Sequence, residues 1–161
     1  MIQSIYLREI AIMFTLIAAV GGSVIACQRG SADLPRIAVY KSPTCSCCTK
    51  WVRHLEEAGF SVESINLKNL DAYKDHKHVP TDLRSCHTAT VDGYVVEGHV
   101  PAEDIKRLLS NRPKISGLAV ADMPIGSPGM ESSDRSLHED FDVTSFGDSG
   151  TRVFASHRAR P

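Results

Sequence analysis

The decisive stretch of this chain is residues 36–59, which read RIAVYKSPTCSCCTKWVRHLEEAG. Arg36–Tyr40 is short and rich in branched apolar residues, so it predicts a β-strand. After a turn, a helix is expected to begin at the cysteines, because apolar residues from Trp51 to Ala58 recur at the spacing of one helical face. Gly59 stands where helices commonly end. The cysteine cluster is therefore expected at the junction between a strand and the N-terminus of a helix.

The rest of the chain continues this alternation. The expected elements after Gly59 are a strand at residues 61–67, a helix at 70–77, strands at 88–91 and 94–97, and a helix at 101–109. Asp92-Gly93, between the two short strands, is a strong hairpin signal. The order β-α-β-α-β-β-α, with a C-x-x-C motif after the first strand, predicts the α/β class and a thioredoxin-like fold of three layers.

Four segments are expected along the chain. They are a leader at residues 1–27, a polar tether at 28–35, a thioredoxin-like metal-binding domain at 36–131 and a C-terminal extension at 132–161. The extension follows a loop rich in glycine and proline, and it is expected to hold a β-hairpin with strands at 141–146 and 152–156. For this hairpin the sequence suggests packing against the domain edge and no further role.

The leader combines a short apolar run with small residues, which is typical of a secretory signal. Its last residues, Val-Ile-Ala-Cys27, resemble a bacterial lipoprotein box, in which the cysteine is acylated. An uncleaved anchor and ordinary cleavage are the alternatives. The 18 residues from Ile10 to Cys27 fall short of the about 20 that a spanning helix needs. Each alternative places the rest of the chain in the periplasm or elsewhere outside the cytoplasm, in contact with the membrane only through this segment.

Composition and charge narrow the range of partners. In 161 residues, 18 Lys and Arg face 19 Asp and Glu, which gives a formal net charge of −1. A nucleic-acid binder should show a basic surface. Aromatic residues, at 6%, are too few to suggest platforms for stacking bases. The composition therefore argues against nucleic acid as a partner.

Three of the five cysteines lie within four positions, at Cys45, Cys47 and Cys48. Unpaired N–H groups and the macrodipole at a helix N-terminus favour a thiolate, which helps both nucleophilic attack and metal ligation. Cys45 and Cys48 suffice for dithiol exchange, so the third thiol, Cys47, favours a metal site.

A second set of donors, Cys86 and His87, lies just before the expected third strand. In a thioredoxin-like fold this segment faces the N-terminus of the first helix, so both side chains are expected near the cysteine cluster. Soft thiolates select Cu(I), zinc or iron–sulfur clusters. The spacing matches zinc sites poorly and iron–sulfur sites not at all. Copper, as Cu(I), is therefore the first candidate and zinc the second.

Two methionines, Met123 and Met130, bracket the loop rich in glycine and proline. Thioethers in an exposed loop can ligate Cu(I), and ordinary loop packing is an equally open interpretation. His99 is a further candidate ligand at the end of the fourth strand. For His87 and His99 the alternative is a capping or surface histidine.

Other polar and aromatic residues receive ordinary interpretations. His76 and His78 could form a weak site for a divalent metal, although a solvated surface is favoured. The remaining assignments are surface charge for Lys68, Lys74 and Lys77, and core for Tyr40 and Trp51.

Four blocks of the chain are distinctive: YKSPTCSCC at residues 40–48, LRSCHT at 83–88, VDGYVVEGHVP at 91–101 and MPIGSPGME at 123–131. Through these blocks, from Val39 to Met130, the chain resembles the CopG-type periplasmic copper-resistance proteins, a metal-binding family long catalogued as a domain of unknown function. The resemblance implies a thioredoxin-like fold, copper binding through the cysteines and a part in copper handling. It implies no established enzyme activity.

Two functions from different classes remain open. The first is a binding protein that takes up Cu(I) through the C-x-C-C cluster and Cys86-His87, then buffers it or passes it to a partner such as another periplasmic copper protein. The alternative is a thiol-disulfide oxidoreductase, with Cys45 or Cys47 as the attacking thiolate and Cys48 or Cys86 as the resolving thiol. Purely structural disulfides are a third interpretation, and four cysteines can pair in three ways. Binding is favoured over an enzymatic role.

Overall fold

The computed structural model describes residues 34–159. The expected leader, its lipidation residue Cys27 and nearly all of the expected tether lie outside these residues. Between residues 34 and 159, no helix is both long enough and apolar enough to span a membrane.

The described chain alternates strands and helices in the expected order. Its elements are β1 (Ile37–Lys41), α2 (Ser46–Glu57), β2 (Val62–Asn66), α3 (Leu70–His76), β3 (His87–Val91), β4 (Tyr94–Glu97), α4 (Ala102–Asn111), β5 (Gly117–Ala119), β6 (Phe141–Gly147) and β7 (Gly150–His157), with short 3-10 turns at Thr81–Leu83 and Arg135–Leu137. The α/β class is confirmed, and each expected strand and helix is found with ends that differ by no more than two residues. Strand β5 was not expected, because its three residues carry too little pattern and only its pairing with β4 defines it.

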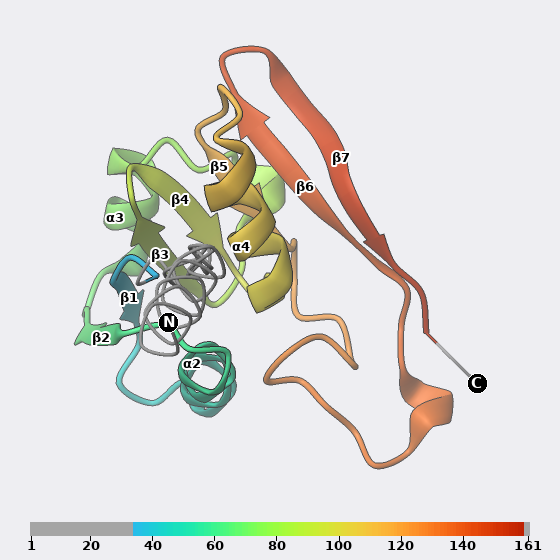
Figure 1. Ribbon diagram of the computed structural model, residues 1–161. Helices are drawn as coiled ribbons and strands as arrows, with labels where there is room; N and C mark the ends of the chain where they lie inside the picture. The colour runs from blue at the N-terminus through green and yellow to red at the C-terminus, as the bar shows by residue number, and fades with distance from the viewer. Residues whose placement is uncertain (1–33, 160–161) are drawn as a thin grey trace, which may run out of the picture. The chain divides into compact units, whose positions relative to one another are not determined.

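The strands of the described chain form one sheet in the order β2-β1-β3-β4-β5-β6-β7 (Figure 1). β1 pairs parallel with β2 and antiparallel with β3, and β4 pairs parallel with β5 after the crossover through α4. The expected C-terminal hairpin, β6 and β7, is confirmed, and β6 pairs antiparallel with β5. The hairpin therefore extends the same sheet that leads into the cysteine cluster.

The β3–β4 hairpin turns at Asp92 and Gly93, with φ angles of 46° and 88°. Two successive positive φ angles are those of a type I′ turn, whose twist matches the flanking strands. The tight turn sets a register in which the beginning of β3 lies beside the end of β4. There the N–H of Gly98 donates to the carbonyl oxygen of His87 at 3.0 Å.

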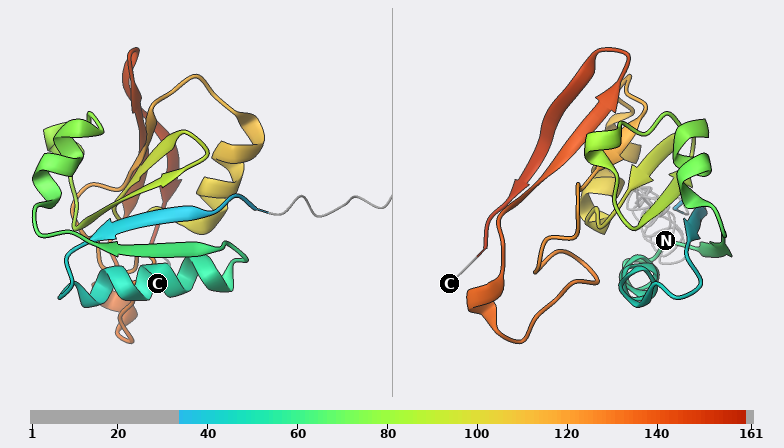
Figure 2. Two further views of the ribbon diagram at one scale, coloured as in Figure 1. Left: turned by 90° about the vertical axis from the view of Figure 1, so that its left-hand side faces the viewer. Right: turned by 180° about the vertical axis from the view of Figure 1, so that it is seen from behind.

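Helices cover both faces of the sheet, and Figure 2 shows α3 and α4 on opposite sides of it. On one face, Trp51 from α2 and Ile105 from α4 belong to a single buried cluster with Val39 of β1. On the other face, Tyr73 of α3 stacks on Tyr40, with ring centroids 4.1 Å apart. Because successive strand residues point to opposite faces, Val39 and Tyr40 mark the two sides of the sheet. The domain therefore has three layers.

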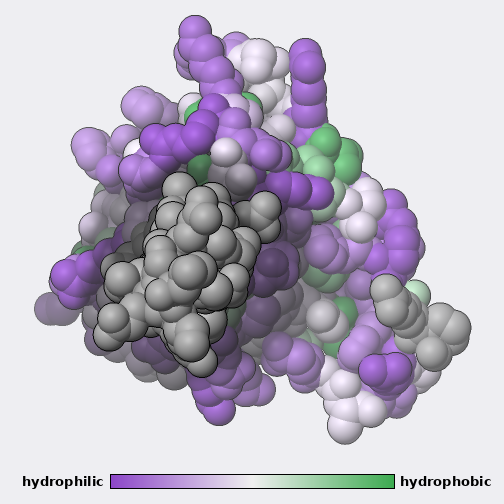
Figure 3. Space-filling view, viewed as in Figure 1, coloured by the Kyte–Doolittle hydropathy of each residue, from purple (hydrophilic) through white to green (hydrophobic). Residues whose placement is uncertain are grey.

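The surface drawn in Figure 3 is largely hydrophilic. Among the described residues, the large apolar side chains that stay exposed are Met123, Leu137 and Val153. Leu137 and Val153 belong to the C-terminal extension, whereas Met123 lies in the loop that adjoins the candidate site.

Candidate metal site

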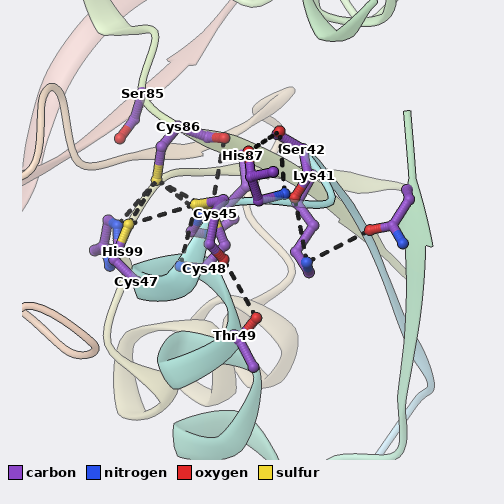
Figure 4. Close-up of a disulfide and its surroundings, with 12 residues drawn as sticks. Lys41, Ser42, Cys45, Cys47, Cys48, Thr49, Ser85, Cys86, His87 and His99 are labelled. Carbon is purple, nitrogen blue, oxygen red and sulfur yellow. Dashed lines mark hydrogen bonds between the residues drawn. A yellow bond between two sulfur atoms is a disulfide. The ribbon is translucent and has the colours of Figure 1, made fainter. Parts of the chain in front are cut away.

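Three cysteines lie at the start of α2 (Figure 4). Cys45 is the N-cap, and its sulfur accepts a hydrogen bond from the N–H of Cys48 at 3.3 Å. This contact satisfies one of the N–H groups that a helix leaves unpaired at its start. Cys45 and Cys48 are joined by a disulfide, whereas Cys47 is a free thiol whose sulfur lies 3.4 Å from that of Cys45. The structure thus shows the oxidised form of the C-x-x-C pair.

Cys86 meets this cluster from the segment that enters β3. Its sulfur lies 3.4 Å from Cys48 Sγ and 3.9 Å from Cys47 Sγ. The pairing of β1 with β3 explains the approach, because Lys41 at the end of β1 lies opposite His87 at the beginning of β3. Since β1 leads into α2, the two segments that carry cysteines are neighbours in space.

His99 lies just after β4, and its Nε2 is 3.1 Å from Cys86 Sγ. Its Nδ1 is 2.7 Å from the carbonyl oxygen of Pro128. A carbonyl oxygen can only accept a hydrogen bond, so Nδ1 carries the hydrogen and Nε2 presents its lone pair toward the sulfur. A backbone carbonyl that orients a histidine in this way is a common support for a metal ligand.

His87 is fully buried beside the cluster. Its Nδ1 lies 3.3 Å from Cys86 Sγ, and its ring packs on Trp51 with centroids 4.3 Å apart. Its Nε2 has no hydrogen-bond partner among the described residues, which is unusual for a buried nitrogen. Both His87 and His99 are inaccessible to solvent, so the interpretation of either one as a surface histidine is wrong.

Burial shifts the protonation of these groups. It lowers the pKa of His87 and of His99, which keeps both rings neutral. Burial also raises the pKa of the Cys86 thiol to about 12, and the neighbouring Cys47 adds to this shift. A bound metal cation would offset the cost of the buried negative charge, because metal ligation replaces the thiol proton.

Two sets of donor atoms overlap at Cys86. One set consists of the sulfurs of Cys45, Cys47, Cys48 and Cys86, and the other consists of Cys86, His87 and His99; within each set the donor atoms lie within 4.8 Å of one another. Thiolates and imidazoles together form a soft donor set, which fits Cu(I) and also zinc. The structure therefore brings the predicted cysteines and His87 to one point and adds His99 to them.

The two predicted methionines lie in the loop beside this cluster. Together with Cys47, Met123 and Met130 line a cavity of about 490 Å³, and the side chain of Met123 is 45% exposed. The loop packs closely on the site at Gly129, where a Cβ atom would lie 2.8 Å from the carbonyl oxygen of Cys47. Gly129 also has a φ of +86°, which favours glycine. Both methionines and the free thiol of Cys47 therefore line the same pocket.

A buried charged pair next to Cys86 could not be recognised from the sequence. The assignment of Lys74 to surface charge is wrong, because its side chain is 3% exposed and forms a short ion pair with Glu97, which is fully buried. Helix α3 is short and weakly patterned, so the sequence does not show which of its residues face the sheet. The one available signal is that Glu97 ends an apolar run in β4. The other side chains assigned to the surface include Lys68, His76 and His78, which are exposed, and Lys77, which is half-buried.

Known proteins resemble this chain in part or over most of its length. Residues 83–130 match a family described as a protein of unknown function, DUF411. A solved structure described as copper resistance protein copG, form 2, is 41% identical to the chain with a TM-score of 0.72; the match covers 77% of this chain and 98% of that one. Form 1 of copper resistance protein copG is 40% identical, also with a TM-score of 0.72, over 78% of this chain and 98% of that one. No match is found among curated proteins.

Proposed function

The chain belongs to the family of CopG copper resistance proteins, and from this premise we propose that it binds Cu(I) outside the cytoplasm in copper resistance or homeostasis. The observation that carries the proposal is the convergence of four cysteine sulfurs and two imidazoles at the start of α2. The protein would hold the metal for buffering or for transfer to another extracytoplasmic copper protein.

We infer the ligands from the two overlapping donor sets. They are Cys45, Cys47, Cys48, Cys86, His87 and His99, with Met123 and Met130 as further ligands at the cavity beside Cys47. Thioether sulfur is a soft ligand that suits Cu(I). The two methionines therefore favour copper over zinc as the metal.

Uptake of Cu(I) by all four cysteines requires the Cys45–Cys48 disulfide to be reduced. An external dithiol can supply two electrons and two protons, so that it becomes a disulfide and Cys45 and Cys48 become thiols. Each cysteine that then ligates copper releases its proton. The sulfur–sulfur distances of 3.4 to 3.9 Å around Cys86 would let the metal pass by ligand exchange, in which a new Cu–S bond forms before an old one breaks.

A thiol-disulfide oxidoreductase is the second candidate, and the disulfide at the N-terminus of α2 favours it. In the reduced form, the Cys45 thiolate would attack a substrate disulfide and release one substrate thiolate. Cys48 would then attack the Cys45 sulfur, release the second substrate thiol and restore the Cys45–Cys48 disulfide. Cys47 and Cys86 are the alternative attacking and resolving thiols.

The test is an anaerobic Cu(I) titration of the reduced full chain against a chromophoric chelator, with alkylation of each cysteine followed by peptide mass spectrometry. We expect wild-type protein to bind copper and its four clustered cysteines to be protected. Cys47→Ser should bind less copper per chain while dithiol exchange through Cys45 and Cys48 persists. Cys86→Ser should lose the most bound copper per chain, because Cys86 belongs to both donor sets.

One result would contradict the copper function, and another would contradict the proposed set of ligands. One is weak copper binding by the wild-type chain together with rapid exchange of its disulfide with a dithiol substrate, which would make the oxidoreductase the better assignment. The other is unchanged copper content in Cys47→Ser, which would remove Cys47 from the ligands. Cys27→Ser is the control, since Cys27 is the proposed lipidation residue and is not among the proposed ligands.

We also infer the organisation of the whole chain. The sheet order β2-β1-β3-β4 and the cysteines between β1 and α2 support a thioredoxin-like domain at residues 36–131, followed by the extension at 132–161. The leader at residues 1–27 and the tether at 28–35 would place this domain in the periplasm, anchored through acylated Cys27. The mass of the mature N-terminal peptide tests this anchor, and an unmodified Cys27 in that peptide would contradict it.

A further inference from the structure

A buried polar group, formed by Lys74, Thr88 and Glu97, lies between α3 and the sheet. The Lys74 ammonium donates to Thr88 Oγ1 at 2.9 Å and forms a short ion pair with Glu97 Oε1. The Thr88 hydroxyl in turn donates to Glu97 Oε2 at 2.6 Å. The side chains of Lys74 and Glu97 are 3% and 0% exposed, so solvent does not share in these contacts.

Fold stability alone does not account for this buried pair. Removing an ammonium and a carboxylate from water commonly costs as much as their attraction returns, and apolar residues of similar volume are often as stabilising. On the opposite face of the same sheet, an apolar cluster packs α2 and α4, and α4 buries one charged residue, Asp104. Glu97 therefore has another role besides holding α3 on the sheet, and its remaining contact indicates what that role is.

The third donor to Glu97 is the backbone N–H of Ser85, which lies 2.7 Å from Glu97 Oε1. Ser85 directly precedes Cys86. Gly98 makes room for this approach, because a Cβ atom there would lie 2.7 Å from the Cβ of Ser85. The Ser85 hydroxyl also donates to the carbonyl oxygen of Asp122, so both ends of the residue are held.

Three residues of this hydrogen-bond network lie close in the chain to a proposed ligand. Ser85 precedes Cys86, Thr88 follows His87, and Glu97 is two residues from His99. The Glu97 carboxylate, at the end of β4, thus contacts residues on both sides of Cys86 and His87 at the start of β3. The burial of Glu97 raises its pKa, while Lys74 and the hydrogen bonds act in the opposite direction and favour the charged form.

We propose that Glu97 of the buried pair is a positioning residue for the metal site: its carboxylate fixes the backbone at Ser85 and so directs the Cys86 sulfur toward Cys47 and Cys48, and Lys74 compensates the buried charge of that carboxylate. The inference rests on the proposed copper function. Loss of a polar group that orients a metal ligand without binding the metal itself commonly weakens metal affinity 10- to 100-fold.

The test compares two double variants of the full chain that both remove the charges. Lys74→Met/Glu97→Leu keeps the volume of the pair but leaves the Ser85 N–H without its acceptor. Lys74→Met/Glu97→Gln retains an amide oxygen that can accept from Ser85. We expect both variants to fold, with similar far-ultraviolet circular dichroism and melting temperatures. We expect the Leu variant to bind Cu(I) roughly 10- to 100-fold more weakly, and the Gln variant to recover most of that loss.

The matched control is Lys106→Met/Glu103→Gln, which removes an exposed ion pair on α4. Its Cu(I) affinity should equal that of the wild-type chain. A merely structural role for the buried pair predicts equal affinities for the Leu and Gln variants at equal melting temperature, and that result would overturn the inference. Unfolding of the Leu variant alone would also count against it, because the pair would then be needed for the fold itself.

A measurement without metal separates this inference from the proposed function. In the reduced apo-protein, Cys86 should be alkylated faster in the Leu variant than in wild type, while the rate at Cys47 stays the same. If the wild-type chain fails to bind Cu(I), the copper function is refuted, and positioning is then judged on the alkylation rates alone. An unchanged rate at Cys86 would refute positioning as well.

Discussion

The candidate site has two halves that the chain holds in different ways. The helix half consists of Cys45, Cys47 and Cys48 at the start of α2, where Cys45 and Cys47 are partly open to solvent and Cys48 is buried. The strand half consists of Cys86, His87 and His99, which come from the start of β3 and the end of β4, with both histidines fully buried. Formation of a single helix turn places the first set. The second set needs the sheet, the buried pair and the covering loop to be in place.

This difference indicates where the site is vulnerable. A change in the helix half alters one donor and leaves the backbone intact. A change in the backbone around the strand half affects three donors together, because Pro128 accepts a hydrogen bond from His99, Gly98 donates to the carbonyl oxygen of His87, and Glu97 holds the residue before Cys86. We therefore expect the largest losses of folding stability from positions near the strand half that carry no donor.

The largest effect is expected for Gly98→Ala. A Cβ atom at Gly98 would overlap the carbonyl oxygen of Val120 and the side chain of Ser85, and the residue has a φ of +68°, so overpacking and backbone strain add. We expect the free energy of unfolding to fall by about 3 kcal/mol, measured by urea denaturation of the apo-protein. Gly93→Ala is the control, since its φ is +88° but its Cβ would meet open space. It should cost about 1 kcal/mol, and equal losses for the two variants would refute crowding around Gly98.

A smaller loss of stability is expected in acid, and His87 and His99 of the strand half should contribute to it together with His54 of α2, whose pKa burial also lowers. Burial lowers the pKa of His87 and His99 below the ordinary 6.5, so the unfolded chain binds protons that the folded chain does not. Their neutral forms contribute stability above pH 6.5, and this contribution is lost as the pH falls toward the folded-state pKa values. We expect the apo-protein to lose about 2 kcal/mol between pH 6.5 and 5, measured by urea denaturation at each pH.

Variants at single histidines sharpen the acid prediction. His87→Gln should flatten the dependence of unfolding free energy on pH, whatever its effect on stability at pH 7. His76→Gln, at an exposed position, should leave the slope unchanged. A wild-type stability that is constant from pH 7 to 5 would show that the strand-half histidines bind protons equally well in the folded and unfolded chains.

The smallest effect is expected at the cavity beside the helix half. Met123→Leu/Met130→Leu removes both thioethers with little change in volume, so stability should hardly change. We expect Cu(I) affinity to fall less than tenfold, or about 1 kcal/mol, measured by chelator competition. Ile125→Leu, in the lining of the same cavity, should have no effect on affinity. If the double variant matched wild type in both affinity and uptake rate, the methionines would be packing residues of the loop.

The sequence predicts the two halves to different extents. The three cysteines of the helix half lie within four positions of the chain. Their proximity and their place at the start of a helix could therefore be predicted from the sequence. The approach of Cys86 and His87 follows from the order of strands, because β3 lies beside β1. Their burial could not be predicted, nor could the contact of His99 with Cys86. These depend on how closely the loop at Pro128 and the residues beside Gly98 pack.

Buried charge is the feature that sequence patterns reveal least. Lys74 lies in a seven-residue helix with a weak apolar pattern, so the sequence predicts an exposed lysine. Only the packing of the helix on the sheet shows that Lys74 is buried. Glu97 follows two valines in β4, and an acidic residue at that position predicts the exposed end of a strand. Only the shared contacts with Thr88 and Ser85 show that these charges belong to one group.

The loop that carries Met123 and Met130 is anchored at both ends, by β5 before it and by β6 after it, and these strands are paired with each other. If Met123 and Met130 bind copper as proposed, they would be tethered ligands. A thioether that dissociates from a copper ion at Cys47 would stay within reach, at an effective concentration on the order of millimolar for a short tether. Free chelators below that concentration would lose the competition for the vacated coordination position. The C-terminal hairpin, although distant from the cysteines in sequence, would thus influence how fast the metal can leave, since it holds the far end of the loop.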